Sequence, residues 1–83
     1  MVEQLEAVHD YRIEVNEVPF REEYQQRTGL QIKQDAIAAG IKIKTTYVLE
    51  QETEDANIRI GDDQLVQIRS GLEFIAHPGG SDS

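Results

Sequence analysis

The sequence predicts a small α+β domain of two layers, with one main helix packed on a mixed sheet. The order of segments carries this prediction, because two extended stretches precede one well-capped helical stretch and further extended stretches follow it. The length and the hydrophobic content of the chain support the same prediction. The 83 residues provide for a single domain, and their 39% hydrophobic content suffices for a folded core of modest size.

The first two extended stretches are predicted to form a hairpin. Residues 11–15 alternate apolar and polar side chains, as a strand with one buried face does. Residues 16–17 supply a turn, and the alternation resumes over 18–21. Because Pro19 has no amide hydrogen, we expect the second strand at an edge of the sheet. The polar segment 22–27 is expected to close this unit.

Both ends of the main helix can be recognised in the sequence. Thr28 and Gln31 have the spacing of a capping box, in which each side chain bonds to the backbone amide of the other residue. The helix-prone segment covers 31–39, and Gly40 stands where a left-handed residue would end it, with Ile41 folding back over the last turn. The apolar stripe comprises Ile32, Ala36 and Ala39, with Ile37 beside it.

The second half of the chain is predicted to complete the sheet. β-Branched and aromatic residues favour a strand around 46–50, and the acidic segment 51–57 follows as an exposed loop. A short strand over 57–60 leads to turn residues at 61–63. The alternation at 72–76 indicates a last strand.

One segment of this half is expected to lack sheet structure. Residues 64–68 are interpreted as a short helical turn or irregular segment that places Leu65 and Ile68 in the core. One helix on a mixed sheet of four or five strands, with the first and last strands parallel at its centre, is the β-grasp (ubiquitin-like) arrangement. A small barrel is the alternative.

Three parts of the chain are distinguished. Residues 1–9 are expected to be a flexible N-terminal extension, because three apolar residues cannot stabilise a short helix in water. Residues 10–77 form the β-grasp domain. Residues 78–83 are expected to be a flexible tail that contains a diglycine and a removable Ser-Asp-Ser.

Composition excludes several classes of function. A formal net charge of -8 argues against nucleic acid as a partner, and no apolar run is long enough to span a membrane. The absence of cysteine removes disulfides and thiolate chemistry. No cluster has metal-ligand spacing, and no nucleophile stands beside a base, so we expect no metal, no cofactor and no catalytic residue: the protein is not an enzyme. We expect it to be soluble and cytoplasmic, since the first residues do not resemble a signal peptide.

The residues at the C-terminal end suggest a chemical role for the tail. A chain cut after Gly80 would end in a slim carboxylate, and residues 77–80 could reach about 13 Å beyond the sheet at ~3.3 Å per residue. Because glycine has no side chain, such a peptide could enter a narrow channel of an activating enzyme, which would join the carboxylate to the α-phosphate of ATP. A frayed terminus with no function is the simpler interpretation of the same residues.

Four segments together resemble bacterial ubiquitin-like modifiers of the multiubiquitin type, which are encoded with dedicated activating, conjugating and processing enzymes. The segments are Tyr11-Arg12-Ile13-Glu14-Val15-Asn16, Thr28-Gly29-Leu30-Gln31-Ile32, Ile60-Gly61-Asp62-Asp63-Gln64-Leu65-Val66 and Phe74-Ile75-Ala76-His77-Pro78-Gly79-Gly80. Their order and spacing cover most of residues 10–80, and this set carries the resemblance.

The resemblance implies a β-grasp fold and a defined set of partners. A JAB-type zinc peptidase would cut between Gly80 and Ser81, and the diglycine of Gly79 and Gly80 would be the conjugated end. An E1-like enzyme, using ATP, and an E2-like enzyme would then transfer the Gly80 carboxylate to amines of target proteins. Operons of this type are associated with antiphage defence.

The lysines are the candidate acceptors if modifier chains form. They are Lys33, Lys42 and Lys44, with the N-terminal amine as a further acceptor, and Lys33 is expected on the exposed face of the helix. Two other functions stay open at this point. One is a β-grasp module that binds a partner without covalent attachment. The other is a sulfur carrier, which would bear a thiocarboxylate at Gly80.

Overall fold

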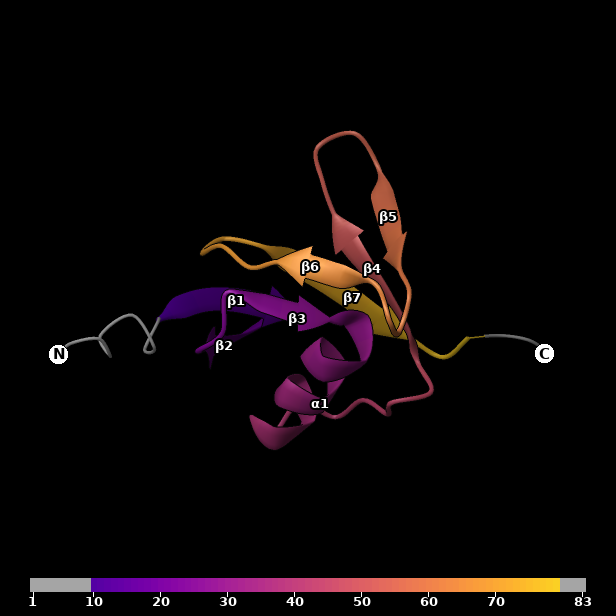
Figure 1. Ribbon diagram of the computed structural model, residues 1–83. Coiled ribbons are helices and arrows are strands. Elements are labelled where there is room, and N and C mark those ends of the chain that lie inside the picture. The colour runs from indigo at the N-terminus through magenta and orange to yellow at the C-terminus, as the bar shows by residue number, and fades with distance from the viewer. Residues whose placement is uncertain (1–9, 80–83) are drawn as a thin grey trace, which may run out of the picture.

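The computed structural model describes residues 10–79, so the predictions for 1–9 and 80–83 lie outside the described residues. Within this range the fold is α+β and of the β-grasp type, as predicted, with one helix on a mixed five-stranded sheet and a second sheet of two strands (Figure 1). The elements are β1 (Tyr11–Val15), β2 (Val18–Glu22), β3 (Gln26–Thr28), α1 (Gly29–Ala38), β4 (Val48–Glu52), β5 (Asn57–Ile60), β6 (Leu65–Gln67) and β7 (Glu73–His77).

The main sheet has the order β2-β1-β7-β4-β5. Its first and last strands, β1 and β7, are parallel neighbours near the centre, as expected. The backbone amide of Glu14 donates to the carbonyl of Leu72 at 3.0 Å, and that of Asn16 donates to Phe74 at 2.9 Å. β2 lies at an edge of the sheet, which agrees with the position of Pro19. β7 is therefore held on both sides, by β1 and by β4.

The β1–β2 hairpin has a tight turn in which both residues are left-handed. Asn16 has φ 54° and Glu17 has φ 68°. This pair of angles matches the twist of the flanking strands, and asparagine tolerates it better than most residues do. The Asn16 side chain also pairs with β7: its amide nitrogen donates to the carbonyl of Ala76 at 3.0 Å, and its oxygen accepts from the Ala76 amide at 2.9 Å. These side-chain bonds continue the parallel pairing of β1 with β7 for one residue beyond the end of β1.

The helix begins and ends as the sequence indicates. The Thr28 hydroxyl accepts from the Gln31 amide at 3.2 Å, and the Thr28 amide donates to the Gln31 side chain at 2.9 Å, which completes the predicted capping box. At the other end Gly40 has φ 98°, and the amide of Ile41 donates to the carbonyl of Ala36 at 3.0 Å. This left-handed stop satisfies a carbonyl of the last turn. Among the described residues, no helix has the length and apolar character that a membrane span requires.

The second sheet corrects two predictions. Segment 22–27 does not simply close the hairpin, because its last residues enter β3, which pairs with β6 in antiparallel register. Segment 64–68 is accordingly a strand and not a helical turn. Strand alternation turns Val66 inward with Ile68, so Ile68 is buried as expected, whereas Leu65 is 57% exposed and lies outside the core.

The core lies between α1 and the main sheet. Leu49, Ile60 and Ala76 are neighbours across β4, β5 and β7, and all three are buried. β4 begins two residues later than predicted, because residues 45–46 form a turn. The buried hydrophobic residues are Ile13, Val15, Phe20, Ile32, Ala36, Ile41, Ile43, Leu49, Ile60, Val66, Ile68, Leu72, Phe74 and Ala76. The predicted stripe residue Ala39 and its neighbour Ile37 are exposed.

Candidate tail site and acceptor lysines

The candidate tail leaves the domain from β7, the central strand of the main sheet. Pro78 and Gly79 follow directly on β7, at the right-hand side of Figure 1. His77, the last residue of β7, lies opposite Val48, the first residue of β4. A Cβ atom on Gly79 would lie 2.9 Å from the Cγ2 of Val48, closer than real side chains approach. Glycine at position 79 therefore lets the chain pass close to the start of β4.

The end of β7 is fastened by side chains on both flanks. The Asn16 side chain bonds to both backbone groups of Ala76 on the β1 side. On the β4 side, Nε2 of His77 lies 3.4 Å from Oε2 of Glu50, and the Nδ1 of the same ring lies 3.2 Å from the carbonyl of Pro78. The backbone that leads into Gly79 is thus positioned by three strands.

A hollow lies next to the base of this tail. It has a volume of about 290 Å³, and its lining includes Thr46 and Val48, which a Cβ atom on Gly79 would contact at 3.9 and 2.9 Å. Its wall also contains Lys33, Asp62 and backbone of the segment that precedes β4.

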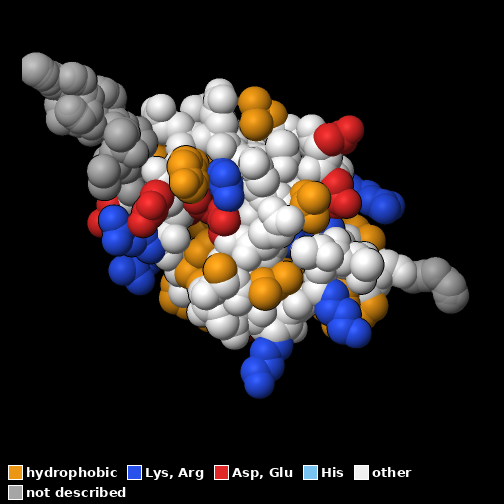
Figure 2. Space-filling model, turned by 60° about the horizontal axis from the view of Figure 1, so that its bottom comes forward, with side chains coloured by type: hydrophobic (Ala, Val, Ile, Leu, Met, Phe, Trp, Pro, Cys, Tyr) orange, Lys and Arg blue, Asp and Glu red, His pale blue; other side chains and the backbone are white. Residues whose placement is uncertain are grey.

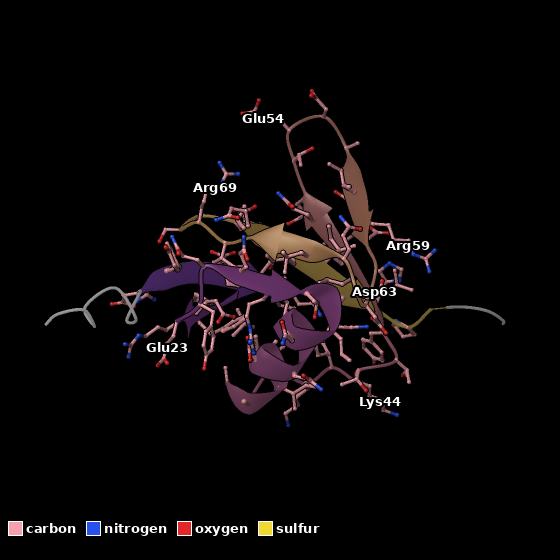
Figure 3. All side chains as sticks on the ribbon, in the orientation of Figure 1. Glu23, Lys44, Glu54, Arg59, Asp63 and Arg69 are labelled. Atoms are coloured by element: carbon pink, nitrogen blue, oxygen red, sulfur yellow. The ribbon has the colours of Figure 1, made fainter. Side chains whose placement is uncertain are left out.

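Two of the three lysines are placed as acceptors would be. Lys42 and Lys44 are exposed and alternate with the buried residues Ile41 and Ile43 in the segment between α1 and β4. Figure 3 shows Lys44 projecting from this segment at the lower right, on the side of the view where the tail leaves. Their amines are therefore open to solvent.

The prediction that Lys33 lies on an exposed helix face is wrong, because the residue is only 2% exposed. Its Nζ donates to the carbonyls of Thr45 at 2.7 Å and Tyr47 at 2.6 Å, and it lies 2.8 Å from Oδ1 of Asp62. The three N–H groups of the ammonium thus meet three acceptors. Lys33 ties α1 to the segment before β4 and to the turn after β5, and its amine is not available in this conformation.

The turn after β5 closes the start of α1. The amide of Gly29 donates to the carbonyl of Gln64 at 3.1 Å, and that of Leu30 donates to Asp62 at 3.0 Å. These bonds satisfy two of the amides that a helix N-terminus leaves free. A Cβ on Gly29 would overlap the carbonyl oxygen of Gly61, so only glycine fits there.

The four segments that carry the family resemblance therefore meet in two pairs. The opening strand lies beside the closing one, and the helix start lies against the turn at 61–64. The sequence predicted the first of these contacts, the parallel pairing of the opening and closing strands, but not the second, between the helix start and the turn at 61–64. Of the candidate site residues, Gly79 is at the base of the tail, whereas Gly80 and Ser81 lie outside the described residues.

Residues 10–79 contain no group of three or more histidine, aspartate or glutamate side chains placed to hold a metal ion. Searches against family models, curated proteins and solved structures give no match for this chain.

Proposed function

We propose that this chain is the precursor of a ubiquitin-like modifier. In this proposal a JAB-type zinc peptidase removes Ser81-Asp82-Ser83, an E1-like enzyme activates the Gly80 carboxylate with ATP, and an E2-like enzyme transfers it to amines of target proteins. Antiphage defence is the biological setting that the family resemblance suggests. The chain itself supplies no catalytic group in this scheme.

One observation carries the proposal: a glycine leads away from the fastened end of the central strand of a β-grasp domain. The strand fixes where the tail begins, because Ala76 is held by Asn16 and His77 lies beside Glu50. Beyond this point Gly79, and in the sequence Gly80, offer an acyl donor without side chains. Entry into a narrow enzyme channel requires a tail whose starting point is fixed and whose last residues lack side chains.

The surroundings of the tail support the same function. The hollow of about 290 Å³ beside Gly79 gives a partner enzyme a surface to grip while it holds the tail. Lys42 and Lys44 are exposed, and are therefore the side-chain acceptors if chains form. Lys33 would have to leave three bonding partners before it could react.

The first test is intact-mass spectrometry after co-expression with the proteins encoded by neighbouring genes. We expect a product that has lost Ser81-Asp82-Ser83, and a zinc chelator should prevent the loss. An Asp82→Ala variant is the matched control, because it alters only the removed tripeptide and should be trimmed to the same product. An intact C-terminus in every combination would contradict the proposal.

The second test separates conjugation from the two alternatives. A chain that ends at Gly80 should attach to proteins in an ATP-dependent manner without the peptidase, and Gly80→Val should abolish attachment. Gly80 is the better position to change than Gly79, because a side chain at 79 also meets Val48. A sulfur carrier would instead show a mass increase that matches exchange of one oxygen for sulfur at this end. A non-covalent module would tolerate the Gly80→Val change with no loss of partner binding.

A further inference from the structure

One carboxylic acid is buried at the edge of the core, away from the tail. Glu22 is the last residue of β2, and the alternation of that strand turns it inward on the same face as Phe20. It is only 2% exposed. A buried carboxylate needs several hydrogen-bond donors or an opposite charge, so its partners decide which form the fold holds.

The two oxygens of Glu22 differ in their partners. Oε2 accepts from the backbone amides of Glu23 at 3.1 Å and Tyr24 at 3.4 Å. Oε1 is buried, and no described residue donates a hydrogen bond to it. An ionised Glu22 would therefore keep an unsatisfied, charged oxygen inside the protein, which is costly.

The cation nearest to Glu22 is already engaged by another acid. Nε and Nη2 of Arg27 donate to the two oxygens of Asp35 on α1, both at 2.8 Å. Nε of Arg27 lies farther from Glu22, at 3.8 Å from Oε2, and its Cζ stands 4.4 Å from the centre of the Tyr24 ring. One guanidinium thus faces two carboxyl groups.

The remaining charged groups nearby do not compensate Glu22. Arg21, the preceding residue of β2, lies 3.1 Å from Asp10 and 3.9 Å from Glu23, all at the surface. Acidic and basic side chains lie close together in the left part of Figure 2, the side on which Figure 3 places Glu23. A hollow of about 280 Å³ separates this group from the end of α1 at residues 38–39.

We propose that the Glu22 carboxyl group carries a proton that it donates to Asp35, and that this hydrogen bond fastens the β2–β3 connection to α1. The proton gives the buried Oε1 of Glu22 a hydrogen-bond partner. It also removes the negative charge of Glu22, so that the Arg27 guanidinium pairs with the Asp35 carboxylate alone. When the proton passes to water, two carboxylates face one guanidinium. The Glu22 side chain then turns out through the adjoining hollow and releases the two amides that it held.

Three influences favour the protonated form of Glu22 over the ionised form. Burial, and then the hydrogen bond and the negative charge of Asp35, together raise the pKa of Glu22 from 4.5 to about 7. The amide of Tyr24 and the charge of Arg27 act in the opposite direction and are weaker. The hydrogen bonds that Arg27 donates to Asp35 also raise the pKa of Arg27, so the guanidinium stays charged throughout.

The consequence for stability has a definite sign. Between pH 4.5 and about 7 the folded chain keeps this proton, whereas the unfolded chain releases it. The contribution of Glu22 is therefore complete below pH 4.5 and is lost as the pH rises to about 7. The fastened connection leads into β3, whose neighbour Gln25 accepts from the Ile68 amide at 2.7 Å, so the small sheet should loosen with it.

The decisive variant is Glu22→Gln, which imitates the protonated acid. Its amide N–H can donate to Asp35 while its oxygen accepts from the amides of Glu23 and Tyr24. Urea unfolding of both proteins is measured at pH values from 4.5 to 8. Over this range the equilibrium constant for unfolding of the wild type, divided by that of Glu22→Gln, should rise by on the order of 100-fold. Glu23→Gln is the control, because Glu23 is exposed and its variant should follow the wild type. Parallel curves for wild type and Glu22→Gln would overturn the proposal.

Two readouts on the folded protein complete the test without any partner enzyme. The ¹³C shift of the Glu22 carboxyl carbon should titrate with a midpoint near 7, and a midpoint at the ordinary glutamate value would overturn the shared proton. Hydrogen exchange of the Ile68 amide, corrected for intrinsic rates, should show at least ~10-fold less protection at pH 8 in the wild type than in Glu22→Gln. Equal protection would overturn the fastening role. Neither result depends on the proposed conjugation.

Discussion

Lys33 and Glu22 are buried to the same degree, yet their charges are held in opposite ways. Each is 2% exposed. Lys33 has three donors and meets two carbonyls and a carboxylate, whereas one oxygen of Glu22 meets no donor among residues 10–79. The contrast shows that the number of suitable partners, and not depth alone, decides whether a buried group stays ionised. Lys33 has a partner for each of its donors, whereas Glu22 in the proposal needs a proton.

The two residues act on opposite flanks of α1. Lys33 and Asp35 are two positions apart on the helix, which turns their side chains about 200° from each other. The Lys33 flank holds the segment before β4 and the turn at 61–64, next to the base of the tail. The Asp35 flank binds Arg27 of β3 and, in the proposal above, also Glu22. We therefore expect the flank that carries Asp35 to loosen as pH rises.

The largest effect is expected from Lys33→Met, which removes the cation but preserves much of the packing. The carbonyls of Thr45 and Tyr47 lose their donor, and the free energy of unfolding should fall by about 3 kcal/mol, given a cost of ~1–3 kcal/mol for each unsatisfied buried group. Urea unfolding monitored by circular dichroism measures it. Lys42→Met is the control on an exposed neighbour and should change stability by less than about 0.5 kcal/mol. An equally small loss of unfolding free energy for Lys33→Met would contradict a stabilising role for the contacts of Lys33.

A smaller effect is expected from Thr28→Ala at the start of α1. Removal of the capping hydroxyl should cost about 1 kcal/mol of unfolding free energy. Because Gln31 bonds back to the Thr28 amide, the two halves of the box should be coupled. A cycle with Gln31→Ala and the double variant measures that coupling, and the double variant should lose less than the sum of the two single losses. Full additivity would show that the two bonds act independently.

The smallest effect is expected from Asp62→Asn. The side chain of Asp62 is mostly exposed although it lies 2.8 Å from the Lys33 ammonium, so the charge it provides should contribute only about 0.5–1 kcal/mol. The asparagine oxygen can still accept from Lys33. Unfolding at low and high salt measures the difference, which should shrink in high salt. A loss as large as that of Lys33→Met would mean that the carboxylate, and not the two carbonyls, holds the buried amine.

The sequence predicted the parts of this fold that depend on local signals. The capping box at Thr28 and the left-handed stop at Gly40 were recognisable because each follows from a few adjacent residues. The edge position of β2 followed from Pro19, and the parallel pairing of the first and last strands followed from the order of elements. These predictions were confirmed.

The errors arose where a distant contact overrode a local pattern. The helix buries Gly29, Ile32, Lys33 and Ala36, a regular stripe in which a lysine was assigned to solvent because it is charged. Only the acceptors at 45, 47 and 62, remote in sequence, explain its burial. Likewise β6 is too short to show alternation by itself, and its pairing with β3 turns Leu65 outward. The burial of Glu22 was not predicted either, because residue 22 was placed in the polar segment 22–27 and not at an inward position of β2.

The central claim is that the Gly80 carboxylate becomes bonded to an amine of another molecule. Peptide mass spectrometry of trypsin-treated conjugates tests it directly, because Arg69 is the last lysine or arginine of the sequence and the cut there leaves a branch of known sequence. The proposal predicts acceptor lysines that carry residues 70–80 as this branch. A branch that continues to Ser83, or attachment that persists when Gly79 and Gly80 are both replaced by valine, would contradict it.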